Sequence, residues 1–326
     1  MYLVTGGGGF IGSNIVAALA ARGEEVVVCD RFGADAKWRN IAKHQVAAVI
    51  EPDDLHAWLA RAPSLKALVH MGAISATTET DADLTIRTNL TLSLALWDWC
   101  AGAGVPFLYA SSAATYGAGE AGFDDDAAPE ALARLRPLNL YGWSKHAFDR
   151  RVADLVRRGR PRPPQWAGLK FFNVYGPNEY HKGGMISVVR RKFDEIAAGG
   201  PARLFRSLRP DIADGEQKRD FVWVGDCVSV VLWLLDTPSV SGLYNLGTGR
   251  ARSYLDLAHA VFAAMGRQPE IVFIDMPATL AGQYQYFTEA RMERLRAAGY
   301  PGQFTPLEQG VEAYVRRHLM AEDPYA

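Results

Sequence analysis

Residues 139–149, NLYGWSKHAFD, place a tyrosine and a lysine four positions apart. On a helix this spacing puts Tyr141 and Lys145 on the same face. A free tyrosine has a pKa of about 10, which is too high for a base near neutrality. A lysine ammonium one turn away, together with a positively charged nicotinamide ring, would stabilise the phenolate and lower that pKa. The pair is therefore a candidate acid/base for hydride-transfer chemistry.

Ser112 is the candidate partner of this pair. It lies in YASSAATYG, residues 109–117, just past a strand-like apolar run. A hydroxyl group at that point could hydrogen-bond the oxygen atom that reacts. Ligands of parallel α/β sheets bind in the loops at the carboxyl ends of the strands, so the position suits a catalytic serine.

A glycine-rich motif, TGGGGFIGSN, occupies residues 5–14. Gly6, Gly9 and Gly12 give the spacing GxxGxxG, and Gly7 with the latter two also gives GxGxxG. Glycines allow a pyrophosphate to approach the backbone at a helix N-terminus, where the amides and the helix dipole favour anions. The motif follows a strand-like run and opens an apolar-periodic helix, so it predicts a dinucleotide cradle rather than a turn without a ligand.

The second strand-like run ends at Asp30. Its carboxylate could bind the hydroxyls of an adenosine ribose, which indicates NAD. Arg31 and Lys37 follow closely, and either cation could neutralise the 2′-phosphate of NADP. Both cations are equally consistent with an ordinary surface role. These residues alone leave the choice of dinucleotide open.

These side chains need a scaffold, and the pattern of apolar runs supplies one. YLVT, EVVVCD, ALVHMG, PFLYAS and LKFFNV are typical of strands buried on both faces. Helical patterns separate them; for example, Leu90, Leu94 and Trp97 predict a helix over residues 84–101 that could face the core or an interface. The alternation predicts an α/β fold with a Rossmann-type, doubly wound parallel sheet.

Beyond Asn173 the alternation weakens, and the pattern predicts one helix near 187–198. The strand–helix rhythm resumes in DFVWVGDCVSVVLWLLD, where Asp226 is a plausible helix N-cap. We therefore expect a smaller, discontinuous α/β substrate-binding lobe. The predicted division assigns residues 1–172 and 221–248 to the dinucleotide-binding domain, and residues 173–220 and 249–326 to the lobe.

The composition excludes several classes of protein. Of 326 residues, 49% are hydrophobic, and 35 basic side chains nearly balance 36 acidic ones. Nothing here indicates binding to nucleic acid or to a membrane surface. Cys29, Cys100 and Cys227 are scattered, which argues against a disulfide framework and a structural zinc site and favours buried, reduced thiols. With no secretory signal pattern or spanning apolar run, we expect a soluble, cytoplasmic protein that binds no metal.

Together these motifs resemble the extended short-chain dehydrogenase/reductase superfamily of nucleotide-sugar epimerases and dehydratases. The resemblance extends over nearly the whole chain, through TGGGGFIGSN, VHMGAIS, ASSAATYG, LYGWSK, FFNVYGP, KRDFVWVGD and YNLGTG. It implies a catalytic triad of Ser112, Tyr141 and Lys145. The cofactor-binding residues that it implies are Gly6, Gly9, Phe10, Ile11, Gly12, Asp30, Arg31, Lys37, Met71, Gly72, Ala73, Ile74, Ser75, Asn89, Lys145 and Val174.

Later segments narrow the resemblance to one branch of the superfamily. EYHKGGM, RLFRS, KRDFVWVGD and AGQYQYFTEARMERLRAAGY are similar to the epimerases that act at C6 of an ADP-heptose, in the supply of heptose for the lipopolysaccharide core. In that branch NADP oxidises C6 to a ketone and returns the hydride to the opposite face. The resemblance implies bound NADP, with NAD as the alternative. It also implies a second acid/base at Lys182, which would otherwise be a solvated loop lysine.

The resemblance also implies where the nucleotide sugar binds. Arg219, in KRDF, suits a bidentate grip on the substrate pyrophosphate. Phe205 and Tyr284 could equally pack within the lobe. The implied substrate-binding residues are Asn173, Gly184, Arg191, Phe205, Arg206, Ser207, Leu208, Arg219 and Tyr284. The chain departs from the branch at Gly184 and Arg191, which replace a serine and a histidine, and near Pro52, where a cofactor-site lysine has no counterpart.

Three alternatives have recognisable signatures. A C4 epimerase of a UDP-sugar would share the triad but would not need Lys182. A 4,6-dehydratase would carry Asp-Glu after Ser112, where this chain has Ala113 and Ala114. A catalytically silent dinucleotide sensor should have lost the tyrosine or lysine of the triad. We therefore expect an ADP-heptose-binding epimerase, and the pattern is compatible with a homo-oligomer.

Overall fold

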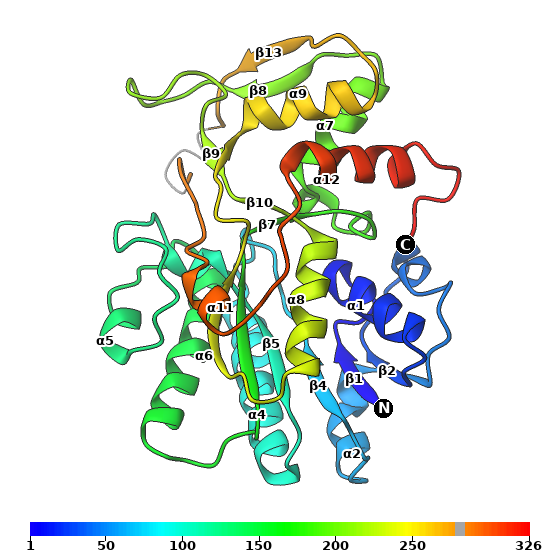
Figure 1. Cartoon of the computed structure of the whole chain (residues 1–326), viewed down its shortest axis with the longest axis vertical. Helices are drawn as coiled ribbons and strands as arrows, with labels where there is room; N and C mark the ends of the chain where they lie inside the picture. The colour runs from blue at the N-terminus through cyan, green and yellow to red at the C-terminus, as the bar shows by residue number, and fades with distance from the viewer. Residues whose placement is uncertain (278–283) are drawn as a thin grey trace.

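The structure is a computed structural model that describes residues 1–277 and 284–326 (Figure 1). The first three residues of the motif AGQYQYFTEARMERLRAAGY, residues 281–300, are not among the described residues. The main sheet has seven strands in the order β11-β6-β5-β4-β1-β2-β3, and every adjacent pair is parallel. The strands are β1 (Tyr2–Thr5), β2 (Val26–Cys29), β3 (Ala48–Ile50), β4 (Ala67–His70), β5 (Phe107–Ser112), β6 (Trp166–Phe171) and β11 (Gly242–Leu246).

This strand order confirms the predicted doubly wound fold. From β1 the chain proceeds to β2 and β3 on one side, and from β4 to β5 and β6 on the other. Since parallel crossovers are right-handed, the two directions place the connecting helices on opposite faces of the sheet. The switch point lies between β1 and β4, where such folds bind their ligands.

Helices and short helical turns surround the sheet (Figure 1). Helix α1 packs against α8, and α6 packs against β5 and the π-helical turn η3. These elements are α1 (Phe10–Ala21), η1 (Ala36–Asn40), η2 (Pro52–Asp54), α2 (Leu55–Leu59), α3 (Ala82–Thr85), η3 (Ile86–Thr91), α4 (Leu92–Ala103), η4 (Ala113–Tyr116), α5 (Pro129–Leu132), α6 (Leu140–Arg157) and α8 (Val224–Asp236).

The predicted helix over residues 84–101 is present as the consecutive elements α3, η3 and α4. The apolar face of this helix packs on the core: Trp97 is buried, and Leu90 and Leu94 are half-buried against it. The polar side chain of Asn89 is fully buried instead. A π-turn contains one residue more than an α-helical turn. The residues before and after it therefore do not follow the 3.6-residue spacing of one continuous α-helix.

A second hydrophobic core lies beyond the sheet and is formed mainly by α7, α9 and α12. Three small sheets accompany it, pairing β10 with β7, β12 with β9 and β13 with β8. The elements are β7 (Asn173–Tyr175), η5 (Gly183–Met185), α7 (Val188–Ala197), β8 (Ala202–Phe205), β9 (Lys218–Arg219), β10 (Phe221–Trp223), β12 (Arg252–Ser253), α9 (Tyr254–Ala264), β13 (Ile271–Ile274), α11 (Glu293–Ala297), α12 (Leu307–Tyr314) and η6 (Val315–Leu319).

Two helix starts in this region test the sequence patterns. The helix predicted near 187–198 is confirmed as α7, and the Ser187 hydroxyl caps it by accepting from the Arg190 amide. The prediction of Asp226 as an N-cap is wrong, because α8 begins two residues earlier. Asp226 lies in the first turn, where its carboxylate accepts hydrogen bonds from the amide and hydroxyl of Thr305, at 2.7 and 2.9 Å.

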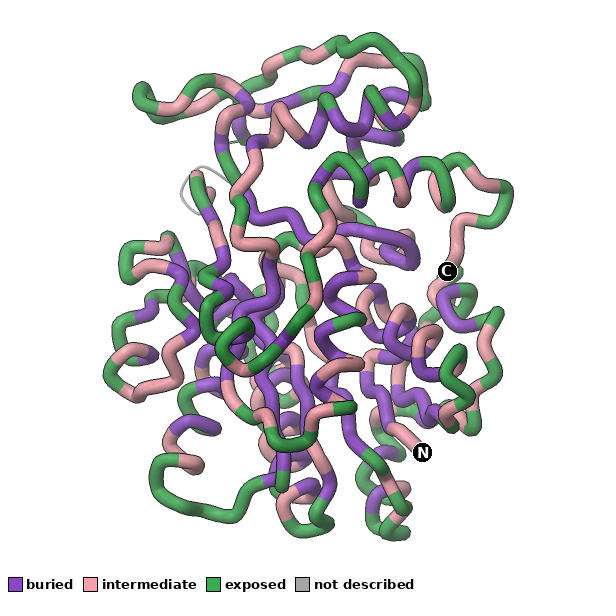
Figure 2. Tube along the Cα trace, in the orientation of Figure 1, coloured by how far each residue is buried: buried purple, intermediate pink, exposed green. Residues whose placement is uncertain are grey.

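Burial follows these two cores (Figure 2). Buried residues run along the strands of the main sheet and the inner sides of the helices, while exposed residues gather in loops. The three cysteines are buried and unpaired, as predicted. Residues 290–300 pack in the main core beside β11, so the two cores share the C-terminal part of the chain. The predicted domain boundaries stay a prediction.

No helix within residues 1–277 and 284–326 combines the length and the apolar character that crossing a membrane requires.

A buried ion pair lies beneath α6. The Asp149 carboxylate and the Lys170 ammonium are 2.7 Å apart, and both side chains are completely inaccessible to solvent. The carboxylate also accepts from the hydroxyls of Tyr109 and Ser111, at 3.1 and 2.6 Å. Because every partner is hydrogen-bonded, this charge pair can persist away from water.

Replacing Asp149 should test how much the fold depends on this pair. Asp149→Asn leaves the Lys170 ammonium buried without a counter-charge, so the free energy of unfolding should fall by about 3–5 kcal/mol. Urea denaturation measures the change. Asp236→Asn is the matched control, because it breaks an exposed ion pair with Arg22 and should cost less than about 1 kcal/mol. Equal losses in the two variants would contradict this account.

Candidate active site

The glycine-rich loop connects β1 to α1 at the switch point. Gly6 has a positive φ of 66°, and a Cβ atom there would lie 2.6 Å from the amide nitrogen of Gly72. A Cβ atom on Gly12 would lie 2.1 Å from the carbonyl oxygen of Gly6. Only glycine fits these two positions. Helix α1 then begins after Gly9, which has no side chain to cap it, and its first turn contains no acidic residue. Its N-terminus therefore suits a pyrophosphate.

The other predicted cofactor residues surround this loop. Asp30 follows β2, and its carboxylate accepts from the Gly8 amide at 2.8 Å and from the Lys37 ammonium at 2.7 Å. Arg31 instead forms an ion pair with Asp53. Of the two cations near the predicted ribose site, Lys37 is thus the one that contacts the carboxylate. Phe10 and Ile11 lie in the first turn of α1, and Val174 lies half-buried in β7.

Asn89 joins the loop after β4 to the catalytic helix. Its amide group exchanges hydrogen bonds with the backbone of Ile74, at 2.8 and 2.9 Å, and also donates to the Ser144 hydroxyl at 3.0 Å. Ser144 in turn donates to the carbonyl oxygen of Tyr141 at 2.7 Å. Since Asn89 is fully buried, it fixes the position of the Met71–Ser75 stretch from beneath. Ser144 was not singled out from the sequence, because only this contact distinguishes it.

The three residues of the predicted triad come from β5 and α6. Ser112 ends β5, and α6 begins at Leu140 because the Asn139 side chain accepts from the Gly142 amide at 2.8 Å. Tyr141 and Lys145 therefore occupy the first two turns of α6, beside the carboxyl end of β5. The Ser112 hydroxyl lies close enough to Tyr141 to act on its phenol, and its effect is to lower the pKa of that group.

Burial nevertheless raises the pKa of Tyr141 overall, because desolvation outweighs the hydrogen bond from Ser112. The sequence-based expectation that the neighbouring lysine lowers this pKa is therefore not met by the protein's own side chains. Burial lowers the pKa of Lys145 to about 8, against an opposing effect of Asp149. Lys145 is thus mostly protonated at neutral pH, and Tyr141 is a proton donor there.

Lys182 lies over the glycine-rich loop. Its ammonium is 5.3 Å from the centroid of the Phe10 ring, and its backbone amide donates to the Glu179 carbonyl oxygen at 3.0 Å. Burial lowers the pKa of Lys182, while the nearby carboxylate of Glu179 raises it. Gly183 follows with a φ of 53°, which places the turn in the left-handed region. The lysine is therefore a partly buried side chain next to the predicted dinucleotide site, not a solvated one.

A cavity of about 540 Å³ opens beside the start of α6. Three predicted substrate-binding residues, Asn173, Arg219 and Tyr284, line it, whereas the other predicted residues do not. The remaining lining residues are Thr77, Thr78, Glu79, Thr80, Ala114, Gly117, Leu138, Asn139, Leu140, Tyr254 and Gln285. Among these residues, only the polar run at 77–80 could have been noticed in the sequence, since it begins two positions after the end of VHMGAIS.

Arg219 is held in this cavity by aromatic rings. Its guanidinium lies 5.7 Å from the ring centroid of Tyr254 and 5.2 Å from that of Tyr284, and it donates to the Lys218 carbonyl oxygen. Among the residues that the structure describes, no carboxylate forms an ion pair with it. A buried, oriented guanidinium without a counter-ion is well suited to a phosphate group.

The remaining predicted substrate residues do not line this cavity. The Phe205 and Tyr284 rings meet edge to face, 6.4 Å apart. Arg206 forms an ion pair with Asp275, and the backbone amides of Ser207 and Leu208 donate to Asp214 and to the Tyr286 hydroxyl. The two positions that depart from the resembled branch contact each other, since the Arg191 guanidinium donates to the Gly184 carbonyl oxygen at 2.8 Å.

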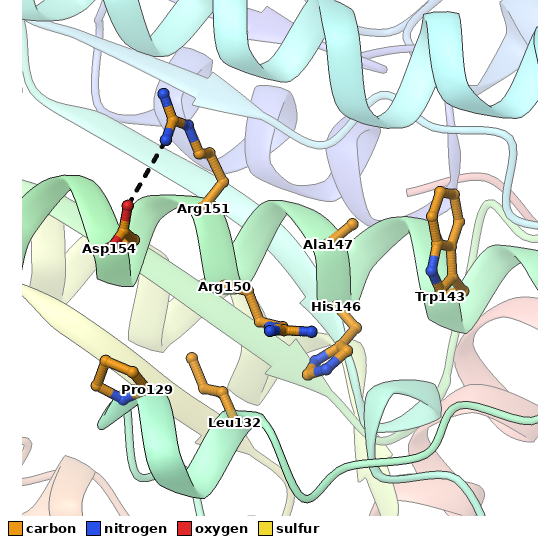
Figure 3. Close-up of a pocket in the computed structure, with 8 residues that line it drawn as sticks. All are labelled: Pro129, Leu132, Trp143, His146, Ala147, Arg150, Arg151 and Asp154. Carbon is orange, nitrogen blue, oxygen red and sulfur yellow. Dashed lines mark ion pairs between the residues drawn. The ribbon is translucent and has the colours of Figure 1, made fainter.

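A second cavity, of about 450 Å³, lies between α5 and α6 (Figure 3). Its lining residues are Pro129, Leu132, Trp143, His146, Ala147, Arg150, Arg151 and Asp154. None of the predicted catalytic, cofactor or substrate residues is among them. The candidate substrate site is therefore the cavity beside the start of α6 and not this one.

The strand order, the glycine-rich loop and the Ser–Tyr–Lys arrangement define a dinucleotide-dependent enzyme of the Rossmann type. The chain belongs to the NAD dependent epimerase/dehydratase family, whose pattern matches residues 2–247. This membership confirms the resemblance seen in the sequence.

Particular relatives are similar over the full length. The chain is 50% identical to the ADP-L-glycero-D-manno-heptose-6-epimerase of Nitratidesulfovibrio vulgaris and 44% identical to that of Fusobacterium nucleatum, with 100% of each chain covered in both comparisons. The crystal structure of the Helicobacter pylori ADP-L-glycero-D-manno-heptose-6-epimerase has a TM-score of 0.79 at 26% identity, covering 97% of this chain and 95% of that one. The Thermus thermophilus UDP-glucose 4-epimerase, in complex with NAD, has a TM-score of 0.73 at 27% identity, covering 95% and 96%.

The lowered pKa of Lys145 has a measurable effect on stability. Between pH 8 and the ordinary lysine pKa of 10.5, the unfolded chain holds a proton that the folded chain has lost, so the contribution of Lys145 to stability rises with pH. Lys145→Met removes this dependence. The free energy of unfolding of the native chain should therefore gain about 2 kcal/mol relative to the variant between about pH 7 and pH 9.5. A difference that stays constant over this range would contradict the lowered pKa.

Proposed function

We propose that the chain is an ADP-L-glycero-D-manno-heptose-6-epimerase, which inverts C6 of an ADP-heptose by oxidation to a ketone and reduction on the opposite face. The observation that carries this proposal is the 50% identity, over the whole of both chains, to a relative of that name. The ADP-heptose would serve the lipopolysaccharide core, and the three buried, unpaired cysteines fit a reducing cytoplasm. A homo-oligomer remains a prediction.

The side chains around the switch point can carry the proton transfers. When bound, a nicotinamide dinucleotide would supply the hydride acceptor for C6 and the hydride donor for the return step. Ser112 and Tyr141 hold the C6 oxygen. Tyr141, in the phenolate form that the Lys145 ammonium and the positively charged nicotinamide ring would together favour, takes the hydroxyl proton as the C6–H bond breaks. After the ketone has turned its other face, a proton from the second acid/base, Lys182, completes the inverted hydroxyl. Lys145 stabilises the phenolate form of Tyr141 through its positive charge.

The cavity beside α6 suits the nucleotide diphosphate part of the substrate. Arg219 would bind the pyrophosphate through paired N–H groups, with Tyr284 and Asn173 in the same wall. Phe205 and its neighbours would flank the adenosine. Because the two departures at Gly184 and Arg191 contact each other, they would alter the sugar pocket together rather than independently.

For the dinucleotide we propose NADP, with NAD as the alternative. The Lys37 ammonium touches the Asp30 carboxylate and so offsets its repulsion of a 2′-phosphate. Lys37→Ala should therefore weaken binding of NADPH about tenfold or more while changing NADH binding little. Fluorescence titration measures both affinities. Arg31→Ala is the control, because the Arg31 guanidinium pairs with Asp53. An equal loss of NADPH affinity in the control would contradict a specific role of Lys37 at the 2′-phosphate.

The reaction itself is tested by proton NMR of ADP-D-glycero-D-manno-heptose incubated with the protein. Tyr141→Phe and Lys182→Met should each lower the rate of C6 epimerisation about 10²-fold or more, because each removes one acid/base. Their dinucleotide content should match that of the native protein. Lys66→Met, which changes an exposed lysine paired with Glu24, should retain the native rate.

Two outcomes would change the proposal. A native rate in Lys182→Met would remove the second acid/base from the mechanism. Inversion of a UDP-sugar at C4, without conversion of the ADP-heptose, would favour the second candidate, a UDP-sugar 4-epimerase. The similarity to the Thermus thermophilus UDP-glucose 4-epimerase supports this candidate.

A further inference from the structure

Residues 323–326 lie against the segment between β2 and β3, where the chain end marked C is drawn in Figure 1. The Lys43 ammonium donates to the Tyr325 carbonyl oxygen at 2.7 Å and forms an ion pair with Asp323 at 3.0 Å. The Arg39 guanidinium lies 4.8 Å from the centroid of the Tyr325 ring. The segment thus binds the turn that directly follows Lys37.

The same residues also bind the loop that contains the proposed second acid/base. The Tyr180 hydroxyl donates to the Pro324 carbonyl oxygen at 2.7 Å, and the Tyr180 and Tyr325 rings meet edge to face at 5.2 Å. The Ala326 amide donates to the Asn178 side-chain oxygen at 3.0 Å. One short segment therefore connects two loops that are far apart in the sequence.

Beneath this contact, buried amides continue to the glycine-rich loop. Asn178 is fully buried, and its side chain donates to the Ser13 hydroxyl at 3.0 Å. The Asn40 side chain donates to the carbonyl oxygens of Gly8, at 2.9 Å, and Asn178, at 3.0 Å. A displacement of residues 323–326 would consequently reach the backbone that cradles the dinucleotide.

Apart from the hydrogen bonds of Lys37 and Asn40, the segment between β2 and β3 has few buried contacts. Within residues 33–45, Asn40 and Ile41 are buried, and most of the others are exposed. Segments with few buried contacts open more readily than the core. The contacts with residues 323–326 therefore supply a substantial part of what holds Lys37 beside the predicted ribose site.

We infer that residues 323–326 form a latch that closes the dinucleotide site and slows release of the bound dinucleotide. The inference rests on the proposed function, because an epimerase must return the hydride from the molecule that accepted it. Release between oxidation and reduction would leave a ketone without its reductant. A latch that opens rarely keeps the dinucleotide in place through both steps.

The test measures release of NADPH from the full-length protein, by stopped-flow fluorescence after mixing with excess NADP. Tyr325→Ala removes the ring contacts with Arg39 and Tyr180, and Lys43→Ala removes the contacts with Tyr325 and Asp323. Each variant should speed release about threefold, and the double variant about tenfold. Epimerisation at saturating NADP should stay within about twofold of native, since no latch residue touches the reacting atoms.

Matched controls separate the latch from a general loss of stability. Phe304→Ala removes another half-buried ring beneath an arginine, Arg296, and Lys66→Ala removes another exposed lysine of an ion pair. Neither should change release. A native release rate in the double variant would overturn the latch while leaving the proposed function intact. A native protein that binds neither NADPH nor NADH would overturn the proposed function, and the latch with it.

Discussion

The close approach of the glycine-rich loop to the loop after β4 is the constraint on which the rest of the site depends. A Cβ atom on Gly6 would collide with the backbone of Gly72, so these two loops can lie in contact only because Gly6 lacks a side chain. Asn89 then ties the second loop to α6 through Ser144. The position of Tyr141 relative to the dinucleotide cradle is therefore set by short, buried contacts rather than by surface loops.

Helix α6 carries two buried charged side chains, Lys145 and Asp149. Asp149 lies one turn beyond Lys145 and binds Lys170 in a region that solvent does not reach. The carboxylate offsets part of the desolvation that lowers the pKa of Lys145, which settles at about 8. The group that holds the core together thus also keeps a positive charge near Tyr141 at neutral pH. The Asp149 carboxylate thus contributes both to the stability of the fold and to the charge of Lys145.

Local patterns in the sequence were sufficient to predict the parallel sheet, the glycine-rich loop that leads into α1, and the helix α7. Contacts between distant segments could not be predicted in this way. The π-turn brings Asn89 into the interior, and Asp226 binds Thr305, which is far along the chain, instead of capping α8. The raised pKa of Tyr141 could not be predicted either, because it results from burial of the phenol, and burial depends on how distant segments pack around it.

Arg219 differs from Lys170 in having tyrosine rings rather than a carboxylate as neighbours. The acidic residue in the same cavity wall, Glu79, is turned towards the backbone amides of Thr80 and Asp81. Arg219 therefore places a positive charge in the cavity wall that no carboxylate among the described residues pairs with, although the whole chain carries a net charge of −1. The attraction between this guanidinium and the diphosphate of the proposed substrate would weaken with added salt, since the Debye length is only about 8 Å at physiological ionic strength.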